Sequence, residues 1–346
     1  MAEDVNVVDP DMGTGYNYDS LFDWEAGEQA NIDASGTIAV AKCRCTGGTA
    51  DTTAVTIDGW TTSSADYIKI WTDTAESYRH NGTYQTGNKY RIETVHDLII
   101  VAEAYCRFIG IQFSRSTASG AYQSHINIDT GDASNAPNIL VDSCIFKEAA
   151  TYTSNIACIY WEYRITSART EVVVNCLFYH AGTSNGYNLA IYNRDYAGNF
   201  YFFNNTIINF GVGIFVNNAN TTNIVRNNLC FACADGYSTN LDTVTNNGYS
   251  EGTDPGTSGV DLSGYAGTDI FVDYTNKDFH LKSGSPCIGY GLNLYNDATY
   301  PFQTDIDGQD RGGAAAAWDI GADEYVADGG ASIVPILLHQ YRARRV

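Results

Sequence analysis

A short pattern of apolar and polar positions recurs through the middle of the chain. Alternating apolar residues are followed by a small polar pair and then by one or two further apolar residues. The clearest copies span residues 139–146, 172–178, 201–208 and 224–231. Residues 244–249 form a degenerate copy, and residues 105–113 resemble an earlier one. Self-similarity of this kind is typical of repeat proteins, in which each repeat packs against its neighbours.

The distance between copies indicates how the chain is wound. Aligned on the polar pair, at Ser143, Asn175, Asn204, Asn227 and Asn246, the copies are 32, 29, 23 and 19 residues apart. One turn of a solenoid tolerates such variation, because loops can leave one corner of a coil. A second family of short strands alternates with the first, at residues 126–128, 157–160, 189–191 and 213–216. Hairpins would instead show two-residue Asn-Gly turns at short intervals. The pattern therefore predicts an all-β fold, a right-handed parallel β-helix.

The residue types of the polar pair suit a sharp turn between two strands. Asn adopts left-handed backbone geometry more readily than other non-glycine residues. Coils stacked about 4.8 Å apart bring equivalent residues into register, so that side-chain amides can form ladders. Cys144 and Cys176 fit the same inward stack. We therefore expect these asparagines to serve as turn and ladder residues and not as ligands.

The regions around the repeats differ from them in composition. Residues 1–35 combine little periodicity with many acids and aromatics, which predicts an N-terminal arm or cap over the open end of the solenoid. The expected order continues with first rungs or a capping sheet at 36–94, coils at 95–250, a closing segment at 251–328 and a basic tail at 329–346.

The charge of the chain is strongly acidic and unevenly distributed. Its formal net charge is −21, which disfavours binding to nucleic acids. The tail is basic and apolar instead, which predicts docking onto a partner or a neighbouring copy, with a solvated, frayed terminus as the alternative. The candidate docking residues are Ile336, Leu337, Leu338, Tyr341, Arg342, Arg344 and Arg345.

Neither a targeting segment nor a metal-binding motif is predicted. The chain opens with acidic residues where a signal peptide would be basic, and its longest late apolar run, residues 333–338, is too short to span a bilayer. Nine cysteines cannot all pair, and their spacing does not match a secreted disulfide framework. We expect buried thiols, and neither a metal ion nor another cofactor.

Candidate catalytic chemistry is sparse. Asn127, Asp129 and Asp132 loosely resemble the Asn-Thr-Asp motif of polygalacturonases, but the accompanying Asp-Asp, Gly-His-Gly and Arg-x-Lys elements are absent. The six histidines never pair at short spacing or accompany a nucleophile motif. The turn at 305–311 looks calcium-like but lacks the distal Glu, so we expect a structural turn in which Arg311 pairs with the acids. No catalytic residue is predicted.

An aromatic stretch supplies the candidate carbohydrate contacts, Tyr160, Trp161 and Tyr163. In a strand, Tyr160 and Glu162 face one side while Trp161 and Tyr163 face the other. One of the two sides is therefore expected to be core.

The C-terminal part of the chain resembles a known group of proteins. Residues 278–289, DFHLKSGSPCIG, look like the segment that closes many bacterial and phage parallel β-helix proteins of the choice-of-anchor type. Residues 305–308 and 319–325 are similar to their final motif. Departures are Cys287, Gly289 and an alanine-rich insertion at 314–317. With the repeats, the resemblance covers roughly residues 95–325 and implies the right-handed parallel β-helix (pectate-lyase-like) superfamily, without a particular function.

Three functions are consistent with these features. The first is a non-enzymatic structural protein of a tailed-phage virion, such as a capsid decoration or head fibre, docking onto other virion proteins or copies of itself. The second is a secreted or displayed carbohydrate-binding β-helix, a polysaccharide lyase or a glycoside hydrolase. This second function predicts a groove along one face of the solenoid, with clustered acids, an arginine and exposed aromatics. The third is a bacterial surface adhesin.

Overall fold

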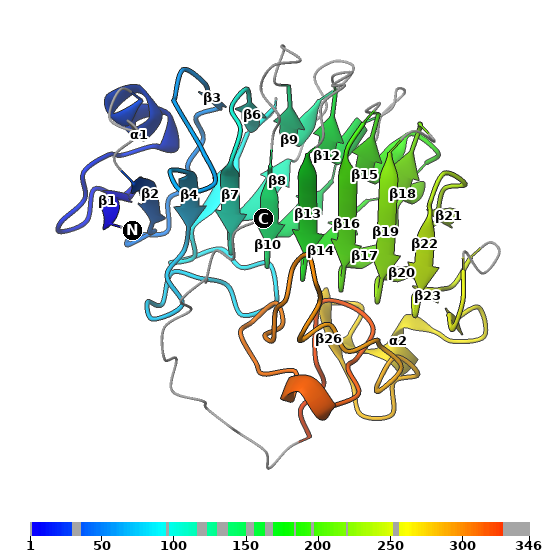
Figure 1. Ribbon diagram of the computed structural model, residues 1–346. Coiled ribbons are helices and arrows are strands. Elements are labelled where there is room, and N and C mark those ends of the chain that lie inside the picture. Colours follow the sequence, from blue (N-terminus) through cyan, green and yellow to red (C-terminus); the bar gives the residue numbers. More distant parts are fainter. Residues whose placement is uncertain are drawn as a thin grey trace.

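The computed structural model describes residues 2–29, 36–94, 97–115, 123–129, 138–149, 156–162, 169–182, 185–194, 197–218, 221–251 and 256–327. Successive coils of the chain stack along one axis and form a parallel β-helix (Figure 1). This confirms the predicted all-β fold. No helix among these described residues is long and apolar enough to cross a membrane.

Three parallel sheets, named A, B and C here, run along the axis in the described part of the chain. Sheet A contains β1 (Ala2–Val8), β2 (Thr37–Cys43), β4 (Ile68–Trp71), β7 (Cys106–Ile109), β10 (Leu140–Asp142), β13 (Thr170–Val174), β16 (Asn199–Phe203), β19 (Thr222–Arg226) and β22 (Thr243–Thr245). Sheet B contains β5 (Arg91–Glu93), β8 (Gln112–Arg115), β11 (Ile145–Glu148), β14 (Leu177–His180), β17 (Thr206–Ile208), β20 (Leu229–Phe231), β23 (Gly248–Tyr249) and β24 (Val260–Asp261). Sheet C contains β3 (Val55–Ile57), β6 (Ile99–Val101), β9 (Ser124–Ile128), β12 (Ile156–Trp161), β15 (Asn188–Asn193), β18 (Val212–Val216) and β21 (Asp235–Tyr237).

Each regular coil therefore has three strands, whereas the sequence pattern predicted two alternating families. The strands of sheet A come before the polar pair, and those of sheet C are the predicted second family. The few apolar residues after each pair form the strands of sheet B, some only three residues long. Such short strands show no periodicity of their own, which is why the third family was missed.

The core consists of inward-facing side chains that repeat from coil to coil. Phe146 lies between Phe113 and Phe178, with ring centroids 4.9 and 4.6 Å apart. Cys144 donates its backbone N–H to Cys176 Sγ at 3.4 Å, as expected for the predicted stack. All nine cysteines are free and buried, which confirms that they pack as small apolar residues.

The polar pairs make the turn between sheets A and B. Ser143, Asn175, Asn204, Asn227 and Asn246 have φ angles between 48 and 58°, in the left-handed region. The second residue of the pair points inward in the later coils, where Asn205, Asn228 and Asn247 are buried and form a ladder of side-chain hydrogen bonds. This confirms that the asparagines are turn and ladder residues. The first residue of a pair can serve both purposes, since Asn227 Nδ2 also donates to Asn204 Oδ1 at 3.0 Å.

The N-terminal residues extend the solenoid and cover its end. Strand β1 pairs in parallel with β2, and helix α1 (Leu21–Glu28) lies over the first coils (Figure 1). Ser20 caps the helix by accepting a hydrogen bond from the backbone N–H of Asp23. Trp24 is fully buried and stacks on Trp60. The strands β2–β5 are rungs of the three sheets.

Residues 262–327 are the part of the predicted closing segment, 251–328, that follows the last strand of sheet B, and they fold back along the solenoid (Figure 1). The name closing segment refers to residues 262–327 from here on. They contain α2 (Gly267–Ile270), the antiparallel pair β25 (Phe271–Asp273) and β26 (Asp278–Leu281), and a short 3-10 helix at Gly313–Ala315. Phe271, Phe279, Leu281 and Ile320 pack on the outer face of sheet B. Leu294 and Trp318 pack on the outer face of sheet A. The described part of the closing segment thus covers sheets A and B, and not sheet C.

Candidate functional site

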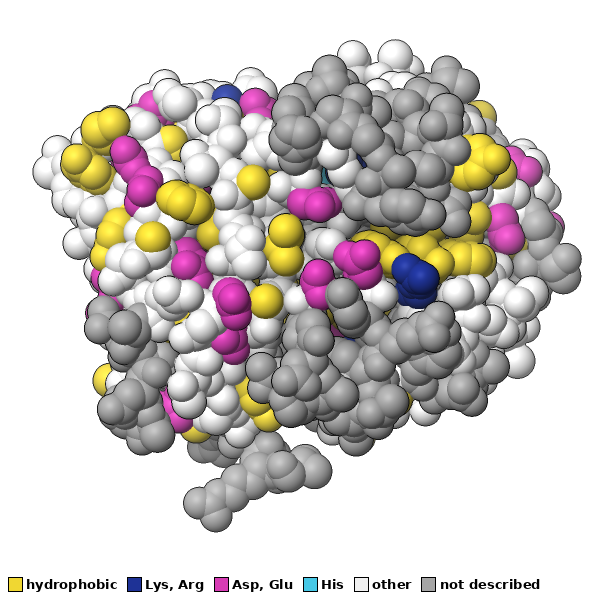
Figure 2. Space-filling model, turned by 90° about the horizontal axis from the view of Figure 1, so that it is seen from above, with side chains coloured by type: hydrophobic (Ala, Val, Ile, Leu, Met, Phe, Trp, Pro, Cys, Tyr) yellow, Lys and Arg dark blue, Asp and Glu magenta, His cyan; other side chains and the backbone are white. Residues whose placement is uncertain are grey.

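The outer face of sheet C carries a stripe of apolar side chains. Ala157, Tyr160, Leu189 and Tyr192 pack there with the half-buried Val212 and Phe215. Tyr160, Tyr192 and Phe215 are register partners in neighbouring strands, and their ring centroids lie 5.0 and 5.1 Å apart. We call these three residues the aromatic stripe. Seen from above, a band of hydrophobic side chains is exposed with acidic and basic side chains beside it (Figure 2).

A row of polar side chains runs next to the aromatic stripe, where the strands of sheet C end. Asp129, Glu162 and Arg194 follow β9, β12 and β15, and backbone hydrogen bonds join the rungs: Glu162 N donates to Ile128 O, and Arg194 N donates to Trp161 O. Arg194 Nη1 also donates to the hydroxyl of Tyr160 at 3.0 Å. Asn127 Nδ2 donates to Glu162 Oε2 at 2.8 Å. We call Asp129, Glu162 and Arg194 the polar row.

The predicted aromatic contacts divide between the two faces of β12. Trp161 points into the core, is only 1% exposed and meets Phe200 edge to face at 5.3 Å. The expectation of a carbohydrate contact at Trp161 is therefore corrected, because strand alternation turns it inward. Tyr160 is on the outer face, 4% exposed, with its ring stacked on Tyr192. Tyr163 lies outside the described residues.

Sequence reasoning missed Tyr192, Phe215 and Arg194. They occupy the positions of Tyr160 and Glu162 in later coils, so an alignment of the second strand family would have found them. Of the polygalacturonase-like cluster, Asp132 lies outside the described residues, and Asn127 hydrogen bonds to Glu162. The predicted docking residues of the tail, 336–345, also lie outside the described residues, and their role stays a prediction.

The Asp-rich turn at 305–311 is held by backbone N–H groups of the turn itself and of Glu324. Asp305 Oδ1 accepts from Gln309 N at 2.7 Å, and its Oδ2 accepts from Glu324 N at 3.0 Å. Arg311 is buried and donates to Glu324 Oε2 and to Asn175 Oδ1, each at 3.0 Å. The predicted structural turn is present, but Arg311 forms its ion pair with Glu324, not with the acids of the turn. Burial raises the pKa of Glu324 to about 7.

A second polar cluster lies beside this turn. His280 of β26 holds its Nδ1 2.5 Å from Asp278 Oδ1, and its Nε2 faces Asp307 Oδ2 at 3.6 Å. Asp323 is 5% exposed and accepts from Leu281 N at 2.6 Å. Burial alone would lower the pKa of His280, but Asp307, Asp323 and Asp278 raise it to about 10. Burial raises the pKa of Asp323 to about 6.

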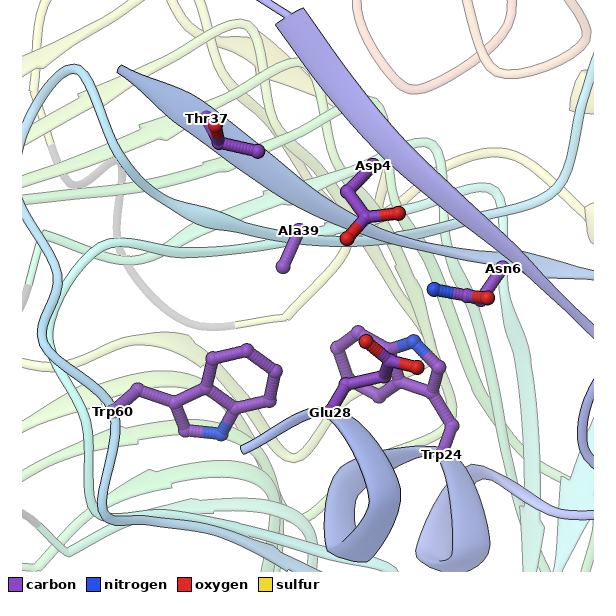
Figure 3. A pocket seen from close by; sticks show the side chains of 7 residues that line it. All are labelled: Asp4, Asn6, Trp24, Glu28, Thr37, Ala39 and Trp60. Carbon is purple, nitrogen blue, oxygen red and sulfur yellow. The ribbon is translucent and has the colours of Figure 1, made fainter. Parts of the chain in front are cut away.

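The cavity at the N-terminal end is too small to be a ligand site. It is lined by Trp24, Trp60, Glu28 and neighbouring residues (Figure 3), and its volume is about 10 Å³. That volume corresponds to roughly one water molecule. The two indole rings and helix α1 therefore pack together at the end of the solenoid and leave no room for a ligand.

The comparisons with known proteins yield a likeness of fold. No family model matches the sequence, and no curated protein matches it. Among solved structures, the crystal structure of pectate lyase Pel9A is similar over 94% of this chain and 97% of that chain, with 11% sequence identity and a TM-score of 0.33. At this level the likeness does not extend to an activity, and the parallel β-helix is established by the sheets themselves.

Proposed function

We propose that this protein is a carbohydrate-binding β-helix that holds an extended glycan along the outer face of sheet C and does not cleave it. The observation that carries the proposal is the pairing of the aromatic stripe with the polar row. Tyr160, Tyr192 and Phe215 contribute one ring per coil, and Asp129, Glu162 and Arg194 contribute one polar group per coil. Both lines run along the solenoid axis, so they favour a linear ligand.

The chemistry of the two lines matches a sugar chain. A sugar ring has apolar C–H faces and a rim of hydroxyl groups, so it is served by aromatic surface next to hydrogen-bonding groups. Carboxylates of Asp129 and Glu162 accept hydrogen bonds from hydroxyls, and the guanidinium of Arg194 donates them. The formal charge of −21 disfavours a polyanionic chain, so a neutral glycan is the better match.

Affinity electrophoresis through gels that contain a neutral or a uronate polysaccharide tests the proposal. We expect retardation by a neutral glycan, and about fivefold weaker binding for Phe215→Ala, since Phe215 is the half-buried ring of the aromatic stripe and an aromatic contact contributes about 1 kcal/mol. Arg194→Gln should weaken binding to a similar extent. Tyr290→Ala is the matched control, because Tyr290 is 59% exposed on the closing segment.

Two results would count against a non-catalytic glycan binder. If neither variant of sheet C changes the affinity for the glycan, the glycan binds elsewhere on the molecule. Release of unsaturated sugar ends from a uronate polymer in the presence of calcium would instead indicate a polysaccharide lyase, the enzymatic form of the same hypothesis.

A structural role in a tailed-phage virion is the second candidate. One observation favours this role. The hydrogen bond from Tyr325 N to Asp319 Oδ2, at 2.7 Å, holds the end of the closing segment on the body, and the apolar and basic tail follows it in the sequence. The tail would dock the body onto a capsid or onto another copy. Truncation after Ala327 should leave a folded protein that no longer joins the particle, and normal incorporation of the truncated form would rule out docking by the tail.

A further inference from the structure

We infer that His280, Asp307 and Asp323 form a binding site for a divalent transition-metal ion, best matched by Zn²⁺. The three side chains offer one imidazole nitrogen and two carboxylate oxygens, and these ligand atoms all lie within 4.8 Å of one another. They come from β26, from the turn at 305–311 and from the end of the closing segment. The sequence analysis expected no metal, and the site is independent of the glycan surface.

The orientation of His280 is that of a metal ligand. Its Nδ1 lies 2.5 Å from Asp278 Oδ1, so that carboxylate holds the ring and leaves Nε2 directed at the cluster. A carboxylate on the far nitrogen is the usual partner of a metal-bound histidine, because it fixes the tautomer and strengthens the donor. Gly82 lies against the ring: a Cβ built at Gly82 would come within 2.3 Å of His280 Nε2.

Two side-chain atoms of the cluster residues have no hydrogen-bond partner. His280 Nε2 and Asp307 Oδ1 are both buried and unpaired. The nearest acid oxygen to Nε2, Asp307 Oδ2, is at 3.6 Å, which is too long for a hydrogen bond. Buried polar atoms without partners are costly, and a cation bound by His280 Nε2 would satisfy that nitrogen.

The spacing suits a small ion. Bonds of about 2.1 Å in a tetrahedral site place the ligand atoms about 3.4 Å apart, close to the 3.6 Å between His280 Nε2 and Asp307 Oδ2. Imidazole together with carboxylates favours zinc over calcium, which prefers oxygen ligands alone. Three protein ligands would leave a fourth position for water or another ligand. The three residues also line an open cavity of about 550 Å³, together with Lys282, Ser283 and Tyr325.

A bound ion would join three stretches of the closing segment that are far apart in sequence. Its effect on the protein is therefore stabilisation of the folded state, by mass action.

Isothermal titration calorimetry of the full chain with ZnCl₂, MnCl₂ and CaCl₂ tests the site. We expect one Zn²⁺ per chain and weaker binding of Mn²⁺. Removing a ligand, in His280→Gln or Asp307→Asn, should abolish the binding. The positioning variant Asp278→Asn should weaken it by about 10–100-fold. Asp310→Asn is the matched control, because Asp310 is an exposed acid of the same turn.

Two further readouts separate the site from other zinc binding. A Co²⁺-loaded sample should lack a sulfur-to-metal charge-transfer band, since all nine thiols are buried elsewhere. The unfolding temperature of the wild type should rise with zinc, whereas both ligand variants should fold without metal and show no rise. Absence of zinc binding, or zinc binding that survives in a folded His280→Gln or Asp307→Asn variant, would overturn the inference and leave a hydrogen-bonded imidazolium cluster.

Discussion

Asn205 donates its side-chain amide to Oδ1 of Asn228, one coil further along the solenoid, at 2.9 Å. Asn228 repeats the contact with Asn247 at 3.1 Å, and its Oδ1 also accepts the backbone N–H of Asn205. The amides therefore satisfy one another and the turn backbone inside the core. Buried polar groups of this kind stabilise one register, because a slip by one residue would leave several of them unpaired.

The first prediction concerns this ladder. Asn228→Ala should destabilise the protein by about 2–4 kcal/mol, because it leaves the Asn205 N–H and the carbonyl of Phe202 without their buried partner. Urea unfolding measures the loss. Asn276→Ala, an exposed turn residue, should cost about 0.5 kcal/mol. Equal losses in the two variants would contradict an architectural role for the ladder.

The second prediction separates two roles of Asn227, its left-handed turn geometry and its contact with the closing segment. Its φ is 58°, and its side chain accepts from Leu292 N at 2.7 Å and donates to Leu292 O at 2.8 Å. Asn227→Gly keeps the left-handed turn and removes these contacts together with the hydrogen bond that Asn227 Nδ2 donates to Asn204 Oδ1 at 3.0 Å. Asn227→Ala should be less stable than Asn227→Gly by about 1 kcal/mol, since alanine strains the left-handed backbone.

Hydrogen exchange tests the contact between Asn227 and the closing segment. The amide of Leu292 should exchange faster in both variants than in the wild type, because its acceptor is gone. Unchanged exchange at Leu292 would show that the closing segment does not depend on this asparagine. Equal stability of the glycine and alanine variants would argue against strain at the turn.

The third prediction concerns the phenylalanine stack of sheet B. Phe146→Ala should cost about 3–5 kcal/mol, because the ring is fully buried between Phe113 and Phe178 and the coils above and below cannot collapse into the space. Thermal or urea unfolding measures the change. Phe22→Ala on α1 is the matched control, since Phe22 is 48% exposed. A loss below about 1 kcal/mol at Phe146 would be inconsistent with a rigid stack.

The fourth prediction is a pH dependence that arises from Glu171. This carboxyl is fully buried, and burial raises its pKa to about 8 despite Arg169 and the hydrogen bond from Ile139 N. In the unfolded chain it titrates near 4.5. Between these two values the folded protein retains a proton that the unfolded chain releases, so the free energy of unfolding falls as the pH rises from 4.5 to 8.

Glu171→Gln removes this term while keeping an acceptor for Ile139 N. Between pH 5 and 8.5 the variant should lose less stability than the wild type, by at least about 1.4 kcal/mol, the equivalent of one pKa unit. Urea unfolding at the two pH values provides the comparison, with Glu3→Gln as an exposed control. Parallel pH profiles of wild type and Glu171→Gln would contradict a raised pKa at this position.

Features that depend on neighbouring residues could be predicted from the sequence. Alternation placed Tyr160 and Trp161 on opposite faces of one strand, and the structure has them so. It could not say which face is core, because that depends on where the next sheet lies. The ion pair of Arg311 shows the same limit: the acids of its own turn were nearer in sequence, but Glu324 is the one that reaches it.

The sequence by itself determined the wound architecture, since left-handed asparagines and alternating strands are local preferences repeated at every coil. Only the tertiary structure decided which surfaces remain available. Asn204 reaches the carbonyl of Gly321 across 117 residues, and this contact helps place the closing segment over sheets A and B instead of sheet C. The cluster of His280, Asp307 and Asp323 is likewise formed only when distant parts of the closing segment pack together. Contacts between such distant residues depend on how whole surfaces fit together, and no short stretch of sequence encodes that fit.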